Sequence, residues 1–198
     1  MSPTDWYCPD ADENGFVPFE VLEKRAGRGS RQQFLKDFPV PGLLVVYRAQ
    51  DPSGGPDFRA EADTILDPTD RGVQLLTMSI RSTAILRYLG KVAFVTKRPG
   101  NPFAHLISIG RSVNNDITLA VDSVSKVHGY FVSAGGGWSF NDHGSTNGSR
   151  LDGVAIVAGE RYPLADGNVL QLGLEALLEF LSPESLYRRA LQKDRRGS

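Results

Sequence analysis

The sequence predicts a mainly β protein, in which a β-sandwich follows a small α/β extension and precedes a short C-terminal helix. Three observations predict this class. From residue 91 onward, short apolar runs alternate with turn residues, which is typical of a sandwich. Before that region, a helical pattern is followed by one apolar, strand-like run. After Pro183, residues 184–193 have the basic composition of an exposed helix.

The composition is that of an ordinary globular protein, and it limits the classes of function. The 198 residues are enough for one large domain, or for one domain with an extension. The hydrophobic fraction is 40%, the charged fraction is 23%, and the net charge is −1. No overall field therefore attracts nucleic acid or a membrane surface, and a bound anion must be held by local geometry.

Cysteine usage and hydropathy predict a cellular location. The single Cys8 excludes an intrachain disulfide and a zinc site built from thiolates of this chain alone, and it suits a reducing compartment. No apolar run approaches the roughly 20 residues that span a bilayer. The first 15 residues lack the apolar core of a signal peptide. We therefore expect a cytoplasmic protein.

The amino terminus is expected to contribute little to the fold. Residues 1–15 are polar, acidic and rich in Pro and Asp, so we expect them to be disordered or loosely tethered. Trp6 and Tyr7 are the exceptions, because they either dock on the folded body or are incidental. The sequence does not decide between these two alternatives.

Residues 18–36 have a helical pattern with apolar residues on one face. Three residues, 27–29, interrupt it. Ser30, followed by Gln33, then predicts a capping box that starts a second helix. Residues 27–31 could in principle cradle a phosphate. They lack the lysine and the preceding strand of a P-loop, so a turn between two helices is favoured.

The next stretch is the least informative part of the chain. Residues 43–47 predict a buried strand that a loop rich in Pro and Gly ends. Beyond it, residues 73–78 could form a strand and residues 80–89 a helix, or the whole stretch could be one extended run. We assign residues 16–88 to an α/β extension of unknown role and residues 85–182 to the sandwich domain.

The region after residue 91 divides into short strands separated by turns. Asp152-Gly153 and Asp166-Gly167 are strong turn pairs, and residues 135–137 form a glycine-rich hairpin tip. The apolar runs predict strands at residues 92–96, 105–109, 117–119, 127–131, 138–140, 162–164, 169–172 and 177–181, and a hairpin within residues 151–157.

Four short polar segments stand at turns between these strands: residues 110–111, 115–117, 125–128 and 145–148. Loops on a rigid β scaffold are a common location for binding sites. A phosphate requires a fixed cation, hydroxyl or amide donors, and a backbone that allows close approach. Arg111 offers a planar fork of donors that suits phosphate oxygens. The segments therefore predict an anion site formed by loops at one edge of the sandwich.

The motifs occur in an ordered set that resembles a known family. They read Gly-Arg, Asn-Asp-Ile-x-Leu, Ser-(basic)-x-His, Trp-x-Phe-x-Asp, Ser-Thr-Asn-Gly, Leu-x-Asp-Gly-Asn and Leu-Gly. This order over residues 85–182 resembles a forkhead-associated (FHA) domain. The resemblance implies a sandwich of about eleven strands that binds phosphothreonine peptides in extended form. It implies no catalysis and no cofactor.

The resemblance also implies roles for individual residues. Arg111 would bind the phosphate, Ser125 would hydrogen-bond it, and Lys126 would occupy the basic site beside that serine. Thr146 and Asn147 would support the phosphothreonine and hold the peptide backbone. Residues with a supporting role would be Gly110, His128 and Gly148, and the residues of the peptide specificity loop would be Arg150, Leu151 and Asp152.

Two positions depart from the family pattern. Lys126 stands where arginine is common, and a lysine contacts phosphate as a point charge, which lowers the expected affinity. Gly129 stands where a slightly larger residue is usual, and we expect it to loosen its strand by about half a kcal/mol. A simpler interpretation also stays open for Ser125, Thr146 and Asn147, because such residues often only cap or nucleate turns.

Two catalytic interpretations are weaker. Asp142 and His143 beside Ser145 suggest a hydrolase, but triad members must meet in space, and adjacency in sequence is no argument for that. His105, His128 and His143 do not have the spacing of metal ligands. We therefore expect no catalytic residue and no metal site.

The sequence thus favours a non-enzymatic adaptor in Ser/Thr kinase signalling. Its partner would be a phosphothreonine-containing protein, such as a kinase or a kinase substrate. We expect it to bind neither nucleic acid nor a membrane. The alternative is an assembly module that uses another face of the sandwich independently of phosphorylation. A third hypothesis makes residues 16–88 an independent enzymatic or sensory domain, but that stretch contains no nucleophile–base pair and no nucleotide loop. The basic tail over residues 183–198 could dock an acidic partner, or nucleic acid weakly, but it is more typical of a solvated helix end.

Overall fold

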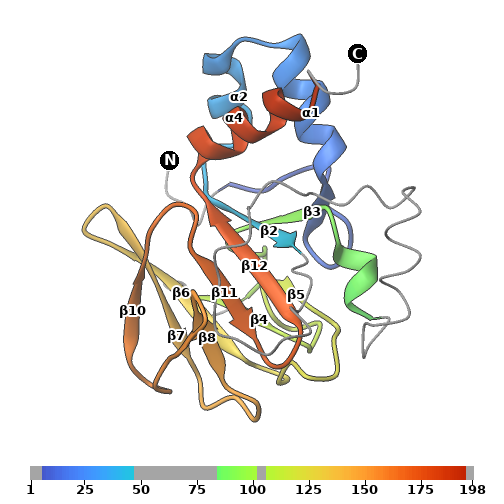
Figure 1. Ribbon diagram of the computed structural model, residues 1–198. Helices are drawn as coiled ribbons and strands as arrows, with labels where there is room; N and C mark the ends of the chain where they lie inside the picture. Colours follow the sequence, from blue (N-terminus) through green and yellow to red (C-terminus); the bar gives the residue numbers. More distant parts are fainter. Residues whose placement is uncertain (1–5, 47–83, 102–105, 195–198) are drawn as a thin grey trace, which may run out of the picture.

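The protein is a β-sandwich with a layer of helices packed on one of its sheets (Figure 1). The structure, a computed structural model, describes residues 6–46, 84–101 and 106–194. The expected fold class is confirmed: the described residues form twelve strands in two sheets, and a helix follows the last strand. Among these residues, no helix is long and apolar enough to cross a membrane.

The larger sheet has seven strands in the order β1-β3-β2-β12-β11-β8-β9. All its hydrogen-bonded neighbours are antiparallel. Its strands are β1 (Phe16–Pro18), β2 (Gly42–Val46), β3 (Lys91–Phe94), β8 (Ser149–Leu151), β9 (Val154–Ala155), β11 (Val169–Leu172) and β12 (Ala176–Leu181).

The smaller sheet has five strands in the order β10-β7-β6-β4-β5, with one parallel pair, β4 and β5, at its edge. Its strands are β4 (Ile107–Gly110), β5 (Ile117–Thr118), β6 (Gly129–Ala134), β7 (Gly137–Asp142) and β10 (Arg161–Leu164). Apolar side chains alternate along these strands, which places one side of each strand in the core. Phe131 and Phe140, for example, are opposite each other in the register and have no exposed surface.

The three described α-helices cover the outer face of the seven-stranded sheet. They are α1 (Phe19–Arg28), α2 (Arg31–Asp37) and α4 (Pro183–Asp194), and they gather above the sandwich in Figure 1. The capping interaction predicted for α2 is present, because the Gln33 amide donates to Ser30 Oγ at 3.1 Å. A second apolar core lies between these helices and the sheet, and it includes Phe19, Leu22, Phe34, Leu44, Val92 and Leu186.

Two strands from the stretch assigned to the extension, β1 and β2, belong to the larger sheet of the sandwich. β2 lies between β3 and β12, and its five residues pair with β12 along their whole length. The predicted boundary at residue 85 is therefore not a boundary between sheets. The reason is that an apolar run shows which residues form a strand, but not which strands it pairs with. The strand suggested at residues 73–78 lies outside the described residues, and the helix suggested at residues 80–89 is represented by one short 3-10 turn, Ile85–Tyr88.

The expectation of a loosely tethered amino terminus is wrong for residues 6–15. Trp6 docks: it is 8% exposed, and its ring packs edge-on against Phe94 with centroids 5.0 Å apart. Its carbonyl oxygen accepts a hydrogen bond from the hydroxyl of Thr96. Cys8 is also buried, whereas Tyr7 is exposed. The apolar surface that one tryptophan buries offsets the ordering of a short polar segment.

The expected effect of Gly129 also requires a correction. A Cβ atom at this position would lie 2.4 Å from Phe140 Cζ and 2.5 Å from the Asn141 carbonyl oxygen. A larger residue would therefore push on the neighbouring strand and on a core ring. Gly129 does not loosen the start of β6; the close packing of β7 against it requires a residue without a side chain.

Candidate functional site

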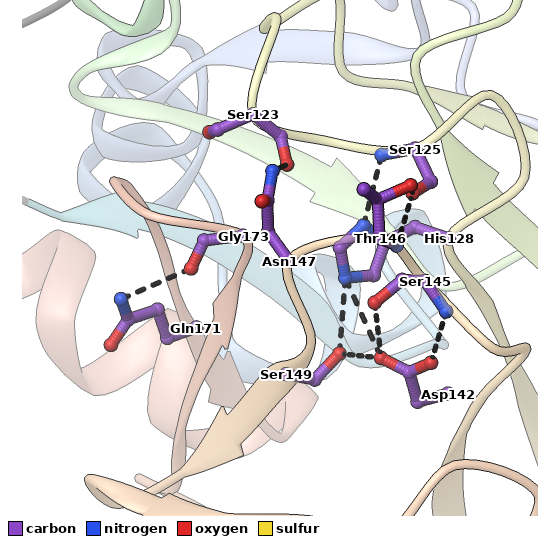
Figure 2. Close-up of polar contacts among 10 residues, drawn as sticks. All are labelled: Ser123, Ser125, His128, Asp142, Ser145, Thr146, Asn147, Ser149, Gln171 and Gly173. Carbon is purple, nitrogen blue, oxygen red and sulfur yellow. Dashed lines mark hydrogen bonds and ion pairs between the residues drawn. The ribbon is translucent and has the colours of Figure 1, made fainter.

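The predicted phosphate residues lie on three loops at one end of the five-stranded sheet. Arg111 follows β4, Ser125 and Lys126 lie between β5 and β6, and Thr146 and Asn147 lie between β7 and β8. Figure 2 shows that the second and third of these loops meet at Ser125 and Thr146. Residues brought from separate parts of the chain thus come together as the sequence predicts.

The first two loops are joined by backbone hydrogen bonds at the end of β4. The Arg111 amide donates to the Ser125 carbonyl oxygen at 2.9 Å, and the Ser112 amide donates to the Lys126 carbonyl oxygen at 3.1 Å. A Cβ atom on Gly110 would lie 2.5 Å from that Lys126 oxygen. Gly110 therefore supports the site by allowing this close approach.

Arg111 presents its guanidinium at the surface, with its side chain 42% exposed. Its Nε donates to the Val124 carbonyl oxygen at 3.2 Å, which fixes one edge of the fork. Its Nη1 lies 4.0 Å from the carboxylate of Asp122, which is itself almost fully exposed and well solvated. The outer N–H groups can therefore exchange this weak contact for an anion with better geometry.

Ser125 and Thr146 connect the second loop to the third. The Thr146 amide donates to Ser125 Oγ at 2.9 Å, and the two hydroxyl oxygens are 3.4 Å apart. Lys126, next along the chain, is exposed. Two hydroxyls and two cationic side chains are thus presented by neighbouring loops, which is the donor set that a phosphate requires.

Asn147 has one side of its amide engaged by the protein. Its Nδ2 donates to the Ser123 carbonyl oxygen at 2.8 Å, and the side chain remains exposed. This contact orients the side-chain carbonyl, which can accept a hydrogen bond from an extended peptide. Gly148, with φ of 71°, has the left-handed backbone conformation that disfavours residues with a side chain.

His128 supports Ser125 from inside the protein, as predicted. Its ring has no exposed surface, and its Nδ1 accepts a hydrogen bond from the Ser125 amide at 3.1 Å. Its Nε2 lies 3.1 Å from Ser149 Oγ, whose hydroxyl donates in turn to Asp142 (Figure 2). An Nδ1 that accepts from an amide requires the neutral ring with its proton on Nε2. Burial lowers the pKa of His128, and the nearby Asp142 carboxylate only partly opposes this effect.

Asp142 is a supporting residue to which the sequence analysis gave no role. Its carboxylate accepts hydrogen bonds from the amide and hydroxyl of Ser145, both at 2.7 Å, and from Ser149. Burial alone would raise the pKa of this carboxyl, but these hydrogen bonds outweigh burial and hold it below the ordinary value. The aspartate of the Trp-x-Phe-x-Asp motif was the available signal, because it ends a strand just before the predicted site.

The geometry gives no support to a hydrolase. His128, Ser149 and Asp142 are in contact, but all three are buried, and Ser149 donates its hydroxyl proton to the carboxylate. A triad requires the opposite arrangement, in which the histidine takes the proton of an accessible hydroxyl and the carboxylate binds the other ring nitrogen. His143 is exposed and stacks edge-on with Tyr130. The described residues contain no group of three or more potential metal ligands.

The three residues predicted to read the peptide differ in accessibility. Asp152 has both carboxylate oxygens engaged, by the Val169 amide at 2.7 Å and the Asn168 side chain at 2.6 Å. Leu151 pairs with Leu170 in the sheet. Arg150 is exposed, although its guanidinium donates to the Gly153 carbonyl oxygen. Arg150 and Asp152 are both exposed, whereas Leu151 is half-buried.

A fourth loop, between β11 and β12, reaches the site without having been predicted. The Gly173 amide donates to the Gly148 carbonyl oxygen at 3.0 Å, and the Gln171 side chain supports the turn through the carbonyl oxygens of Gly173 and Leu174. Leu174 is 64% exposed. The Leu-Gly motif marked this turn in the sequence, but its proximity to Gly148 depends on the order of strands in the sheet.

Comparison with known proteins gives one family and several solved structures. Residues 107–173 match the family model of the FHA domain. EmbR of Mycobacterium tuberculosis, solved in complex with a low-affinity phosphopeptide, is 29% identical with a TM-score of 0.37. The match covers 40% of this chain, which spans 20% of the EmbR chain.

Two further solved structures are similar to parts of the chain. The FHA domain of an Arabidopsis thaliana hypothetical protein is 28% identical with a TM-score of 0.41, over 48% of this chain and 75% of that one. The FHA domain of a Chlamydia trachomatis protein is 24% identical with a TM-score of 0.36, over 39% and 76%. No curated protein matches the chain.

Proposed function

We propose that the chain is a recognition module for phosphothreonine-containing peptides, because residues 107–173 match the family model of the FHA domain. The observation that carries this proposal is the convergence of two cations and two hydroxyls on adjoining loops. Arg111, Lys126, Ser125 and Thr146 present donors toward solvent, while the backbone beneath them is fixed by hydrogen bonds. Preorganised donors of this kind favour a dianionic phosphate over a neutral hydroxyl.

Different loops of the site would bind different parts of the ligand. Arg111, Ser125 and Lys126 would hold the phosphate, and Thr146 with Asn147 would hold the phosphothreonine and the adjoining backbone. Arg150 closely follows Asn147 in the chain, and the turn before Leu174 contacts Gly148 through the Gly173 amide, so residues beyond the phosphothreonine would pass near Arg150 and Leu174. An extended peptide suits this site, because an extended backbone offers its amide groups to Asn147.

The cellular role that follows is that of a non-enzymatic adaptor in Ser/Thr kinase signalling. Its partner would be a protein phosphorylated on threonine, whether a kinase or a kinase substrate. A protein with a net charge of −1 has no overall attraction for anions, so recognition would depend on this local site. The phosphate group is then the main source of both affinity and selectivity.

A phosphothreonine peptide library applied to the full chain tests the proposal. We expect binding by fluorescence anisotropy that weakens as salt increases, with unphosphorylated peptides inert. Arg111→Ala should lower affinity about ten- to a hundredfold, because it removes hydrogen bonds to a charged group. Lys126→Ala should cost less, because a lysine acts as a point charge.

Arg28→Ala provides the matched control, since Arg28 is an exposed arginine at the end of α1 in the helical layer. It should leave affinity unchanged. If no phosphothreonine peptide binds the folded chain, the proposal is wrong. A protein partner whose capture survives Arg111→Ala and phosphatase treatment would instead support the phosphorylation-independent assembly module.

A further inference from the structure

The loop that carries Arg111, residues 111–116, is held on two sides. On one side, its backbone joins Ser125 and Lys126, and the Asn115 side chain donates to the Lys126 carbonyl oxygen at 2.7 Å. On the other side lies Arg98, in the connection between β3 and β4. The guanidinium of Arg98 donates through Nη1 to the Val113 carbonyl oxygen at 3.1 Å.

Arg98 also contacts the amino-terminal segment. Its Nη2 donates to the Glu13 carbonyl oxygen at 3.0 Å, so one guanidinium bridges residues 13 and 113. The backbone amide of Arg98 donates to Asp116 Oδ1 at 2.8 Å. The side chain of Asp116 is completely buried, and Lys97 neutralises it. The backbone of Arg98 is therefore bound to Asp116, at the end of the same loop whose tip the Arg98 guanidinium holds.

The amino-terminal segment, residues 12–16, is itself firmly placed. Asp12 Oδ1 accepts hydrogen bonds from the Asn14 amide at 3.0 Å and the Phe16 amide at 2.9 Å. The Thr118 amide donates to the Asn14 carbonyl oxygen at 3.1 Å, next to the far end of the Arg111 loop. Phe16 has no exposed surface and anchors the segment in the core between the sheets. The segment can therefore act as a fixed support.

Besides Arg98, the tip of the Arg111 loop is held by hydrogen bonds: the Asn101 side chain donates to the Asn114 carbonyl oxygen at 3.5 Å, and the Asn115 side chain donates to the Ser112 carbonyl oxygen at 2.7 Å. Val113 is 70% exposed, so apolar packing does not hold it. A loop end that depends on hydrogen bonds opens more easily when one is removed, because fewer buried contacts oppose the motion. The donors of Arg111 are useful to a phosphate only when they are held in place before binding.

From these contacts we infer that Arg98 is a positioning residue of the phosphate site, and that it links residues 12–16 to the loop that presents Arg111. The inference rests on the proposed function. It extends the site beyond residues 107–173, because both Arg98 and the amino-terminal segment lie outside the matched domain. Arg98 acts through Arg111 and does not itself contact the ligand.

The test compares peptide affinity in the full chain. Arg98→Ala should weaken binding of a phosphothreonine peptide about three- to tenfold, which corresponds to the loss of one or two ordinary hydrogen bonds. Arg98→Lys should restore part of the affinity, since an ammonium group can still donate to one carbonyl. We expect an Arg111→Lys variant to keep measurable binding, because lysine retains the positive charge. On that background, the effect of Arg98→Ala should shrink.

Arg25→Ala is the matched control. Arg25 also bridges two segments, through Asp10 and Asp37, but it does so in the helical layer. It should leave affinity unchanged. Hydrogen exchange gives a second readout: in Arg98→Ala, the amides of residues 111–116 should exchange faster, while those of residues 142–149 stay as in the parent chain.

The outcomes separate this inference from the proposed function. If the parent chain binds no phosphothreonine peptide, the proposed function fails and the inference fails with it. If the parent chain binds but Arg98→Ala binds equally well, the inference alone is overturned. It is also overturned if Arg98→Ala lowers affinity by the same factor on both Arg111 backgrounds, because the residue would then act by another route.

Discussion

Two buried aspartates support the loops of the candidate site, and they do so by different means. Asp116 ends the loop that carries Arg111, and Asp142 begins the loop that carries Thr146 and Asn147. Both are nearly inaccessible to solvent, with 5% and 2% of their surface exposed. Each accepts hydrogen bonds from a backbone amide and from a serine hydroxyl, so each fixes a turn next to the site.

The difference between the two aspartates lies in the counter-charge. Asp116 has a lysine partner, Lys97, whose Nζ lies 2.9 Å from Oδ2 and which is also buried. Asp142 is stabilised by amide and hydroxyl donors, and its nearest ionisable neighbour is His128, with Nε2 3.6 Å from Oδ2. A neutral His128 supplies no positive charge. The Arg111 loop is therefore anchored by an ion pair, and the loop of Thr146 and Asn147 is anchored by hydrogen bonds from neutral groups.

This contrast has a physical consequence. A buried ion pair is stable only as a pair, because removing one partner leaves the other charge without compensation in a poorly solvated site. A carboxylate held by neutral donors leaves no opposite charge behind when it is replaced. The two loops should therefore respond differently to the same substitution.

The largest expected effect is at the ion pair. Asp116→Ala should destabilise the protein by about 3–5 kcal/mol, because the ammonium of Lys97 stays buried without its counter-charge. Chemical denaturation of the full chain measures this loss. The double variant Lys97→Met with Asp116→Asn should recover part of it, since it removes both charges and keeps one acceptor. A loss below about 1 kcal/mol in Asp116→Ala would mean that the pair behaves like an exposed one.

A smaller effect is expected at the second aspartate. Asp142→Asn should cost about 1–3 kcal/mol, because one acceptor becomes a donor that faces the hydroxyls of Ser145 and Ser149. The matched variant is Asp116→Asn, which leaves Lys97 unpaired and should cost more in the same denaturation experiment. Equal losses in the two variants would remove the distinction between the two loops.

The serines that bind the two carboxylates allow a finer comparison. Ser149→Ala should destabilise the protein by about 1–2 kcal/mol, since it deprives the buried His128 Nε2 of its partner as well as Asp142. Ser108→Ala should cost about 1 kcal/mol. Asp116 keeps Lys97 and two amides, but its own amide loses the Ser108 hydroxyl that accepts from it. Thermal unfolding of both variants would reveal the ranking, and the reverse order would contradict it.

The last effect concerns pH. Burial lowers the pKa of His128 below the ordinary value of 6.5, so the unfolded chain binds this proton more readily than the folded chain. Stability should therefore be fully present above pH 6.5 and fall as the pH drops below it, by at most about 1.4 kcal/mol per pH unit. The lowered pKa of Asp142 acts in a separate window, below its ordinary value of 3.8.

Denaturation between pH 7 and pH 5 measures the contribution of His128. His128→Asn should remove the slope in that range, whatever its effect on total stability. His143→Asn is the control, because His143 is exposed, and it should keep the slope. A slope that persists in His128→Asn would assign the titration to another group.

Much of the site could be predicted because its residues form short motifs at the ends of strands. The alternation of apolar residues places β4, β6 and β7 in the sequence, and the polar segments between them mark the loops. The motifs predicted a supporting role for His128. The sequence did not predict that Gly129 is required by close packing. The Phe140 ring that comes close to it lies eleven residues away, on the next strand.

The supports of the site depend on contacts that periodicity does not encode. Asp142 and Ser149 lie seven residues apart, yet their meeting requires the turn that connects β7 to β8. Arg98 and Glu13 are 85 residues apart, and Trp6 and Thr96 are 90 residues apart. No local pattern indicates which distant backbone carbonyl a side chain will reach.

The sequence by itself determined the fold class, the resemblance to the FHA domain family and the loops that carry the polar residues, because strand periodicity and turn chemistry are local properties. The tertiary structure alone decided that β2 lies inside the larger sheet, that Trp6 is buried, and that two different aspartates hold the loops of the candidate site. Strand order and side-chain partners are set by packing between segments distant in sequence, and an alternating pattern satisfies many such pairings equally well.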